Sequence, residues 1–288
     1  MEYLIHIAIL VCIYGILGLS LNLSVGETGL LNVSQAAFYG IGAYATALLM
    51  LNFYFNFFLA AIAGMLLAGV IALAVGVVFS RLREVYYAFA TIGFCVIAYS
   101  IMLNWQSVTQ GPLGIPGISR PELFGFRFGE NIAFLALAAA VLLAVYGICS
   151  FITSSSFGRV LHAIREDEQM ISIFGYSTTY YKLVIFVIGA MLAALAGSLF
   201  ASYITFIDPS SFQLFESIFI LAIVILGGLG SARGVVLGAL FLIVLPEALR
   251  FVGFPPDVAA QMRQVVYGLI LILLMLYRPQ GLMGTFRL

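Results

Sequence analysis

The hydrophobic positions of this chain gather in long runs that short polar stretches separate. A helix that crosses a bilayer needs about 20 predominantly apolar residues. Runs of this kind occupy 3–23, 57–79, 86–103, 131–152, 183–205, 213–229, 234–252 and 264–277, and a shorter one with internal glycines occupies 36–52. Short or glycine-interrupted runs are also typical of half-helices and re-entrant segments. The pattern predicts an all-α, polytopic transmembrane helix bundle of eight to ten spans, with residues 1–288 as one transmembrane domain.

The composition supports a chain that lies in lipid. Hydrophobic residues make up 64% of it and charged residues only 8%, whereas soluble domains carry about 25% charged residues. The net charge is zero and no polybasic tract occurs, so nothing indicates nucleic-acid binding. Cys12, Cys95 and Cys149 lie unpaired inside apolar runs, which favours buried thiols over a disulfide or a metal site. The first apolar run is too long for a signal peptide and lacks its basic flank.

Basic residues in the connecting loops predict the orientation, because Lys and Arg favour the cytoplasmic side. With nine spans, one set of loops carries Arg81, Arg83, Arg159, Arg165, Lys182, Arg233, Arg278 and Arg287, and the other carries Arg120, Arg127, Arg250 and Arg263. The larger set predicts a cytoplasmic C-terminus and an external N-terminus. Residues 104–130, rich in Gly and Pro, are then an external loop, and the loop at about 153–182 is cytoplasmic.

The stretch "FGRVLHAIREDEQM" (157–170) concentrates charge in an otherwise apolar chain. A serine among 154–156 can cap a helix there, and Gly175 can end it. Apolar residues fall near one face of this helix, namely Val160, Leu161, Ile164, Ile171 and Phe174. The segment is either an interfacial helix with solvated charges or a docking helix for a cytoplasmic partner. Its balanced charge favours docking slightly, because interfacial anchors tend to be basic.

Several sequence motifs resemble one transporter family. "GRVLHAIREDEQMISIFGYSTTYYKLVIF" (158–186) resembles the coupling loop of permease subunits from ABC importers for branched-chain amino acids. "LNLSVGETGLLNVSQAAFYGIGAYATALL" (21–49), "VILGGLGSARGVVLGALFLIVLPEALR" (224–250) and "YRPQGL" (277–282) resemble its other signatures. "TQGPLGIPGI" (109–118) is similar to its external loop, with Gln110 where Gly is more usual. "GLLNVSQAAFYGIGAY" (29–44) is closer to the M-type of the two paralogous permease subunits.

The resemblance implies a permease domain that imports branched-chain amino acids through the bacterial inner (plasma) membrane. The implied partners are a second homologous permease subunit in a heterodimer, two cytoplasmic ATP-binding subunits, and a periplasmic or extracellular substrate-binding protein. The implied ATPase-coupling residues are Gly158, Arg159, His162, Ala163, Arg165, Glu166, Asp167, Glu168 and Gly175. Lys182, the single lysine, follows "TTYY" and does not form a phosphate-binding loop. We therefore expect a transport subunit that is no enzyme and holds no cofactor or metal, with ATP and Mg on its partners.

The path of the substrate should contain polar residues at membrane depth, which are costly unless they face a cavity or a partner. Candidates are Asn22, Ser34, Gln35, Tyr39, Tyr44 and Glu216, together with Asn32, Thr91 and Asn104. Glu216 could attract an amino group or could lie at the headgroup level. Glycines expected to pack helices closely are Gly26, Gly29, Gly40, Gly42, Gly227, Gly228, Gly230, Gly234 and Gly238.

Alternative functions remain open from the sequence. Permeases for urea or short amides have nearly the same motifs. A secondary transporter would need coupling acids or histidines within the membrane, and His6 and His162 offer little of this. A channel would need a recognisable polar filter.

Overall fold

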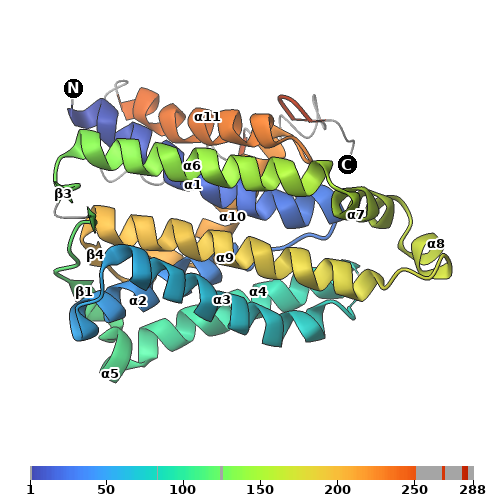
Figure 1. Ribbon diagram of the computed structural model, residues 1–288, viewed down its shortest axis with the longest axis horizontal. Helices are drawn as coiled ribbons and strands as arrows, with labels where there is room; N and C mark the ends of the chain where they lie inside the picture. The colour runs from blue at the N-terminus through green and yellow to red at the C-terminus, as the bar shows by residue number, and fades with distance from the viewer. Residues whose placement is uncertain (1, 83, 124–125, 251–267, 270–280, 285–288) are drawn as a thin grey trace.

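A computed structural model describes residues 2–82, 84–123, 126–250, 268–269 and 281–284, which form a bundle of helices (Figure 1). The long helices are α1 (Glu2–Thr28), α2 (Gln35–Phe53), α3 (Phe57–Phe79), α4 (Glu84–Asn104), α6 (Asn131–Ser154), α9 (Thr178–Ile204), α10 (Leu214–Gly227) and α11 (Ala232–Arg250). Short elements join them: α5 (Gln106–Thr109), α7 (Ser156–Glu166), α8 (Glu168–Ile173), and the 3₁₀ turns η1 (Gly111–Leu113) and η2 (Pro209–Phe212). The predicted all-α class is confirmed for these residues.

Strands are few and short among the described residues. β1 (Ile115–Pro116) pairs antiparallel with β4 (Phe206–Ile207), and Ile115 faces Ile207 in the register. β2 (Glu122–Leu123) pairs antiparallel with β3 (Phe126–Arg127). The loop that was expected to be rich in turns therefore holds two small ribbons, and one of them ties it to the segment between α9 and α10.

Six of the described helices are long and apolar enough to cross a membrane, namely α1, α2, α3, α4, α6 and α9. The expected runs 213–229 and 234–252 form α10 and α11, whose apolar parts are shorter. α10 has 14 residues, about 21 Å at 1.5 Å per residue, against a hydrocarbon core of about 30 Å. The run 264–277 lies mostly outside the described residues, so the expected eight to ten spans stay a prediction.

The antiparallel helices α1 and α9 form the centre of the bundle (Figure 1). His6 near the start of α1 bonds Tyr203 near the end of α9, with 2.6 Å between Nδ1 and the hydroxyl oxygen. α2 and α3 pack on α9, while α6, α10 and α11 pack on α1. α1 is apolar around its whole circumference, as expected of a helix that neighbours enclose, and almost all of it beyond Tyr14 is buried.

The two ends of the bundle differ. α5 and the strands lie at one end, and we call it the β-strand end (Figure 1). α7 and α8 project from the other end, which we call the α7–α8 end. Residues 29–34, which join α1 to α2, are non-helical, and four of the six are buried. The joint begins at Gly29, whose φ of +72° favours glycine because a side chain there is strained.

Candidate functional site

The charged segment (residues 153–182) forms two helices, where the sequence predicted one. Ser155 caps α7, and its hydroxyl accepts a hydrogen bond from the Gly158 amide at 3.3 Å. At Asp167 the backbone is extended, with φ −155° and ψ 99°. The Asp167 carboxylate accepts from the Met170 amide at 2.9 Å and so starts α8. The prediction of one continuous helix was wrong because Asp167 is a strong N-cap residue.

Gly175 ends α8, as the sequence predicted for the end of the segment. Its φ is +89°, its amide bonds the Ser172 carbonyl at 3.1 Å, and the Tyr176 amide bonds the Ile171 carbonyl at 3.4 Å. This pair of bonds is the Schellman pattern, in which a left-handed residue satisfies the last carbonyls of a helix.

Two side chains of α7 point inward and fasten it to the last turn of α1. His162 Nε2 lies 2.5 Å from a carboxylate oxygen of Glu27, a side chain that is only 1% exposed. The Arg165 guanidinium donates to the Gly26 carbonyl, and its aliphatic part packs on Gly29, where an added Cβ would lie 3.1 Å from Arg165 Cγ. We call these five residues the α7–α1 joint. The resemblance implied a coupling role for His162 and Arg165, and in this structure both side chains contact α1 of the same chain.

The protonation state of His162 follows from its surroundings. Burial lowers the pKa of His162 below its ordinary value, and the Arg165 guanidinium acts in the same direction against the opposing Glu166 carboxylate. The imidazole is therefore largely neutral near pH 7.

A second ionic contact fastens α8 to the start of α9. Lys182 is 5% exposed, and its ammonium group pairs with the Glu168 carboxylate. Thr178 donates to the same Glu168 oxygen at 3.0 Å. A buried ammonium is costly without a partner, so Glu168 holds Lys182 in place and α8 against α9.

The outward face of α8 is apolar. Ile173 is 81% exposed, Phe174 71% and Met170 55%, with Tyr176 and Tyr180 exposed beside them. We call these five residues the α8 ridge. Leu161 and Ile164 of α7, by contrast, are buried in the bundle. The five apolar positions predicted to share one face therefore divide, because the break at Asp167 turns α8 away from α7.

The other predicted coupling residues have varied surroundings. Gly158 packs so closely under the end of α6 that an added Cβ would lie 2.6 Å from the Ile152 carbonyl oxygen. Arg159 is exposed and donates to the Ser156 hydroxyl at 2.8 Å. Ala163 is half-buried, whereas Glu166 and Asp167 are exposed.

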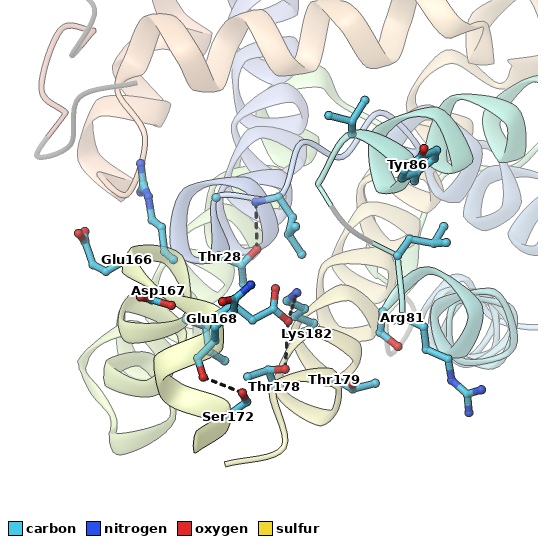
Figure 2. A pocket seen from close by; sticks show the side chains of 18 residues that line it. Thr28, Arg81, Tyr86, Glu166, Asp167, Glu168, Ser172, Thr178, Thr179 and Lys182 are labelled. Atoms are coloured by element: carbon cyan, nitrogen blue, oxygen red, sulfur yellow. Dashed lines mark hydrogen bonds and ion pairs between the residues drawn. The ribbon is translucent and has the colours of Figure 1, made fainter. Parts of the chain in front are cut away.

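A cavity of about 890 Å³ opens beside the charged segment, between α7–α8, the end of α1, the α3–α4 connection and the start of α9. Figure 2 shows Glu168, Thr178 and Lys182 close together on one side, with Arg81 and Tyr86 across from them. Its lining carries acids, bases and hydroxyls together.

Polar side chains predicted for the substrate path bond one another and buried backbone around residues 29–34. Gln35 donates to Ser20, and the Ser34 hydroxyl donates to Asn32 at 2.7 Å. Thr91 accepts from the Val33 amide at 3.2 Å. Non-helical backbone at membrane depth must find such partners, so these contacts stabilise the connection between α1 and α2. Asn104 is exposed and donates to the Ser100 carbonyl of its own helix.

Asn22 links α1 to the turn between α10 and α11. Its side-chain oxygen accepts from the Gly230 amide at 3.0 Å. Gly26 lies between them, since an added Cβ would lie 2.8 Å from the Gly230 nitrogen. Gly228 and Gly230 have φ of +108° and +77°, as the tight turn requires. Gly26 is also the acceptor for Arg165, so one turn of α1 contacts both α7 and the α10–α11 turn.

Glu216 lies on α10 beside Tyr14, whose hydroxyl donates to its carboxylate. Tyr14 is 12 positions after the first residue of α1, about 18 Å along the helix. Glu216 thus lies beside the middle of α1. Tyr39 and Tyr44, on α2, are buried with exposures of 1% and 4%.

The remaining glycines lie where helices cross closely. Gly42 faces the Ala194 backbone of α9, and Gly227 faces Gly234 across the α10–α11 pair. A Cβ on Gly238 would lie 2.5 Å from the Ile223 carbonyl oxygen. Gly40 differs, because its neighbours are the side chains of Met102 and Phe212.

Two residues at these sites were not found from the sequence. Glu27 was a lone acid at the end of an apolar run, and that isolation was a usable signal. Phe212 contacts both Tyr39 and Tyr44, yet one phenylalanine among 25 carries no signal of its own.

Comparisons with known proteins agree with the motifs. A family model described as "Branched-chain amino acid transport system / permease component" matches residues 3–275. The chain is 36% identical to the high-affinity branched-chain amino acid transport system permease protein LivM of Salmonella typhimurium, over 98% of this chain and 70% of that protein. It is 31% identical to the corresponding LivH protein of Escherichia coli K12, over 94% and 91%. A probable LivM protein of Methanocaldococcus jannaschii is 27% identical, over 94% and 90%.

No solved structure matches the chain. The sequence matches cover almost its whole length, and six of the described helices are apolar and long enough to cross a membrane. The chain is therefore an integral membrane protein that belongs to the family of permease components of branched-chain amino acid transport systems.

Proposed function

We propose that the chain is the M-type permease subunit of an ABC importer for branched-chain amino acids in a bacterial inner membrane. A second permease subunit pairs with it, two cytoplasmic ATP-binding subunits bind its α7–α8 end, and a substrate-binding protein delivers the amino acid to its β-strand end. ATP and Mg belong to the ATP-binding subunits. Its family membership supports the substrate class, and its greater identity to LivM than to LivH supports the M-type assignment.

The α8 ridge is the observation that carries this function. Ile173 and Phe174 are among the most exposed large apolar residues that the structure describes, and α8, which ends beside them, projects beyond the long helices (Figure 1). An apolar helix face that projects from a bundle suits a groove on a partner. Glu166 and Asp167 lie exposed beside the ridge and can set the orientation of the docked subunit.

Movement of a docked subunit would reach the transmembrane helices through two connections. The α7–α1 joint links the segment to α1, and the Glu168–Lys182 pair links it to α9. These are the two central helices of the bundle. A nucleotide-driven shift of the α8 ridge would therefore tilt the α1–α9 pair, a rigid-body transition of the rocking kind.

The test is assembly and uptake with Phe174→Glu. The chain is expressed with its partner subunits, the ATP-binding subunits are recovered by affinity purification, and uptake of labelled leucine is compared with that of urea and acetamide. A charge in the centre of a docking surface should reduce recovery of the ATP-binding subunits by about tenfold or more. Leu113→Glu, equally exposed at the β-strand end, is the matched control and should retain them.

Each outcome has one meaning. Recovery of the ATP-binding subunits at the wild-type level with Phe174→Glu would contradict docking at α8. Uptake of urea or acetamide in place of leucine would support an importer but contradict the proposed substrate class.

A further inference from the structure

Four aromatic side chains from three elements meet between α2 and α9. The Phe212 ring centre lies 5.1 Å from that of Tyr39, 5.8 Å from that of Tyr44 and 6.3 Å from that of Phe200. The angles between the rings are those of edge-to-face contacts. We call these residues the Phe212 cluster. Phe212 ends η2, so the cluster joins two long helices to a non-helical segment.

The hydroxyl groups of this cluster are unusual. Among the described residues, the Tyr39 and Tyr44 hydroxyls are buried without any hydrogen-bond partner. A buried polar group left in that state costs about 1–3 kcal/mol, and native proteins keep such groups rare. Two on one helix, both beside Phe212, indicate that the hydroxyls find their partners in another state of the protein.

Gly40 makes room for the Phe212 ring. A Cβ there would lie 2.9 Å from Phe212 Cγ and 2.7 Å from Met102 Cε. Both neighbours are side chains, so the ring rests on α2 without an interlocked backbone. Phe212 also follows β4 by only a few residues, and β4 pairs with β1 in the loop at the β-strand end. A shift of that loop would therefore carry Phe212 with it.

Two carboxylates lie four positions before and after Phe212 in the sequence. Asp208 is the N-cap of η2, and Glu216 lies in the first turn of α10. Burial disfavours ionisation of Asp208, but hydrogen bonds from Ser210, from Ser211 and from its own amide outweigh it, and they lower its pKa. The segment that carries Phe212 thus brings carboxylates close to aromatic surface, which suits a ligand with an ammonium group and an apolar body.

We infer that the Phe212 cluster is a closed substrate site, in which Phe212 occupies the place of an aliphatic amino-acid side chain. When Phe212 withdraws, the Tyr39 and Tyr44 hydroxyls bond the polar head of the zwitterion. Phe200 and the freed face of α2 contact its aliphatic side chain, while Glu216 and Asp208 attract its ammonium group. This inference rests on the proposed function and adds the residues that contact the substrate.

Removal of each hydroxyl tests the site, because stability and transport should then change differently. Tyr39→Phe and Tyr44→Phe should leave the thermal midpoint of the purified chain unchanged or raised, since neither loses a bond of this state. Each should raise the KM for leucine uptake by the assembled importer about fivefold, the equivalent of one hydrogen bond of about 1 kcal/mol. The maximal rate should change less than the KM.

Tyr203→Phe is the matched control, because its hydroxyl is bonded to His6. It should lower the thermal midpoint and leave the KM unchanged. An unchanged KM in both Tyr39→Phe and Tyr44→Phe would overturn the inference, and so would a fall of their thermal midpoints as large as that of Tyr203→Phe.

The proposed function and the inference fail in distinguishable ways. If the wild type imports acetamide or urea instead of leucine, the KM of that compound decides the inference. Glu216→Gln should have little effect on the KM of acetamide or urea, because neither carries an ammonium group. It should raise the KM of leucine, which does. If the wild type imports none of these compounds, the inference is tested by whether leucine raises the thermal midpoint of the purified permease pair. Stabilisation that Tyr39→Phe abolishes supports the site, and its absence in the wild type refutes it.

Discussion

The α7–α1 joint and the Phe212 cluster are both buried, and they differ in what approaches their polar groups. In the joint, the Gly26 carbonyl accepts from Arg165, and the Glu27 carboxylate lies 2.5 Å from His162, although its Oε2 has no hydrogen bond among the described residues. In the cluster, the described side chains give the hydroxyls of Tyr39 and Tyr44 no hydrogen bond. Satisfied polar groups stabilise one arrangement, whereas unsatisfied ones favour another that supplies partners. The contrast separates a fixed mechanical connection from a surface that changes during transport.

Breaking the joint should have the largest effect. Arg165→Glu removes the bond to the Gly26 carbonyl and places a second carboxylate near Glu27. A hydrogen bond from a charged group contributes about 1.5–3 kcal/mol, so ATP-driven uptake should fall by about tenfold or more while the chain still inserts. Uptake per inserted subunit is the measurement, with Arg165→Lys as the conservative control that retains the charge. Uptake within twofold of the wild type would show that α7 is not held here.

Substitutions at two glycines of α2 compare the packing of α2 on the α9 backbone with the packing of α2 on the Phe212 cluster. A Cβ at Gly42 meets the Ala194 backbone, whereas one at Gly40 meets the side chains of Met102 and Phe212. Gly42→Ala should therefore destabilise the chain by about 1–3 kcal/mol, the range for overpacking. Gly40→Ala should cost clearly less, because the side chains can move. Thermal unfolding in detergent measures both, with Gly147→Ala as control because a Cβ there meets no described atom within 4 Å. Equal losses of stability in Gly40→Ala and Gly42→Ala would mean that the Phe212 side chain can move no more than the Ala194 backbone.

The smallest loss of stability is expected at Asn22, which lies one helical turn before Gly26 of the α7–α1 joint. Asn22→Ala removes the acceptor of the Gly230 amide and should lower stability by about 1 kcal/mol. Asn104→Ala, which removes an exposed side chain bonded within its own helix, should leave the thermal midpoint unchanged. If the two variants behave alike, the bond between α1 and the α10–α11 turn contributes nothing measurable.

Hydrophobic run length predicted the positions of the long helices, and the run 213–229 matches α10 (Leu214–Gly227) within two residues at each end. It could not predict that the turn after α10 bonds α1, because the Gly230 amide donates to Asn22, which is about 200 positions away. Periodicity predicted the helical character of the charged segment but not the break at Asp167, where one N-cap bond outweighed a continued pattern.

Residue type alone could not predict which groups the polar side chains contact. Arg165 donates to the Gly26 carbonyl, far away in the sequence, and Glu168 pairs with Lys182 of the next helix. Gln35 donates to Ser20 of α1, and the Ser34 hydroxyl donates to Asn32. The contacts of Arg165 and Gln35 join different helices, and no local pattern records them.

The unequal lengths of the helices make the molecule sensitive to the thickness of its bilayer. α1 and α9 have 27 residues each, about 40 Å, so they must tilt or extend beyond a hydrocarbon core of about 30 Å. α10 is half as long and can reach only one surface. A thicker bilayer would reduce the tilt of the α1–α9 pair and would leave the orientation of α10 unchanged. Membrane thickness therefore acts on the same helix pair that α7 and α8 hold, and lipid chain length becomes a mechanical input to transport.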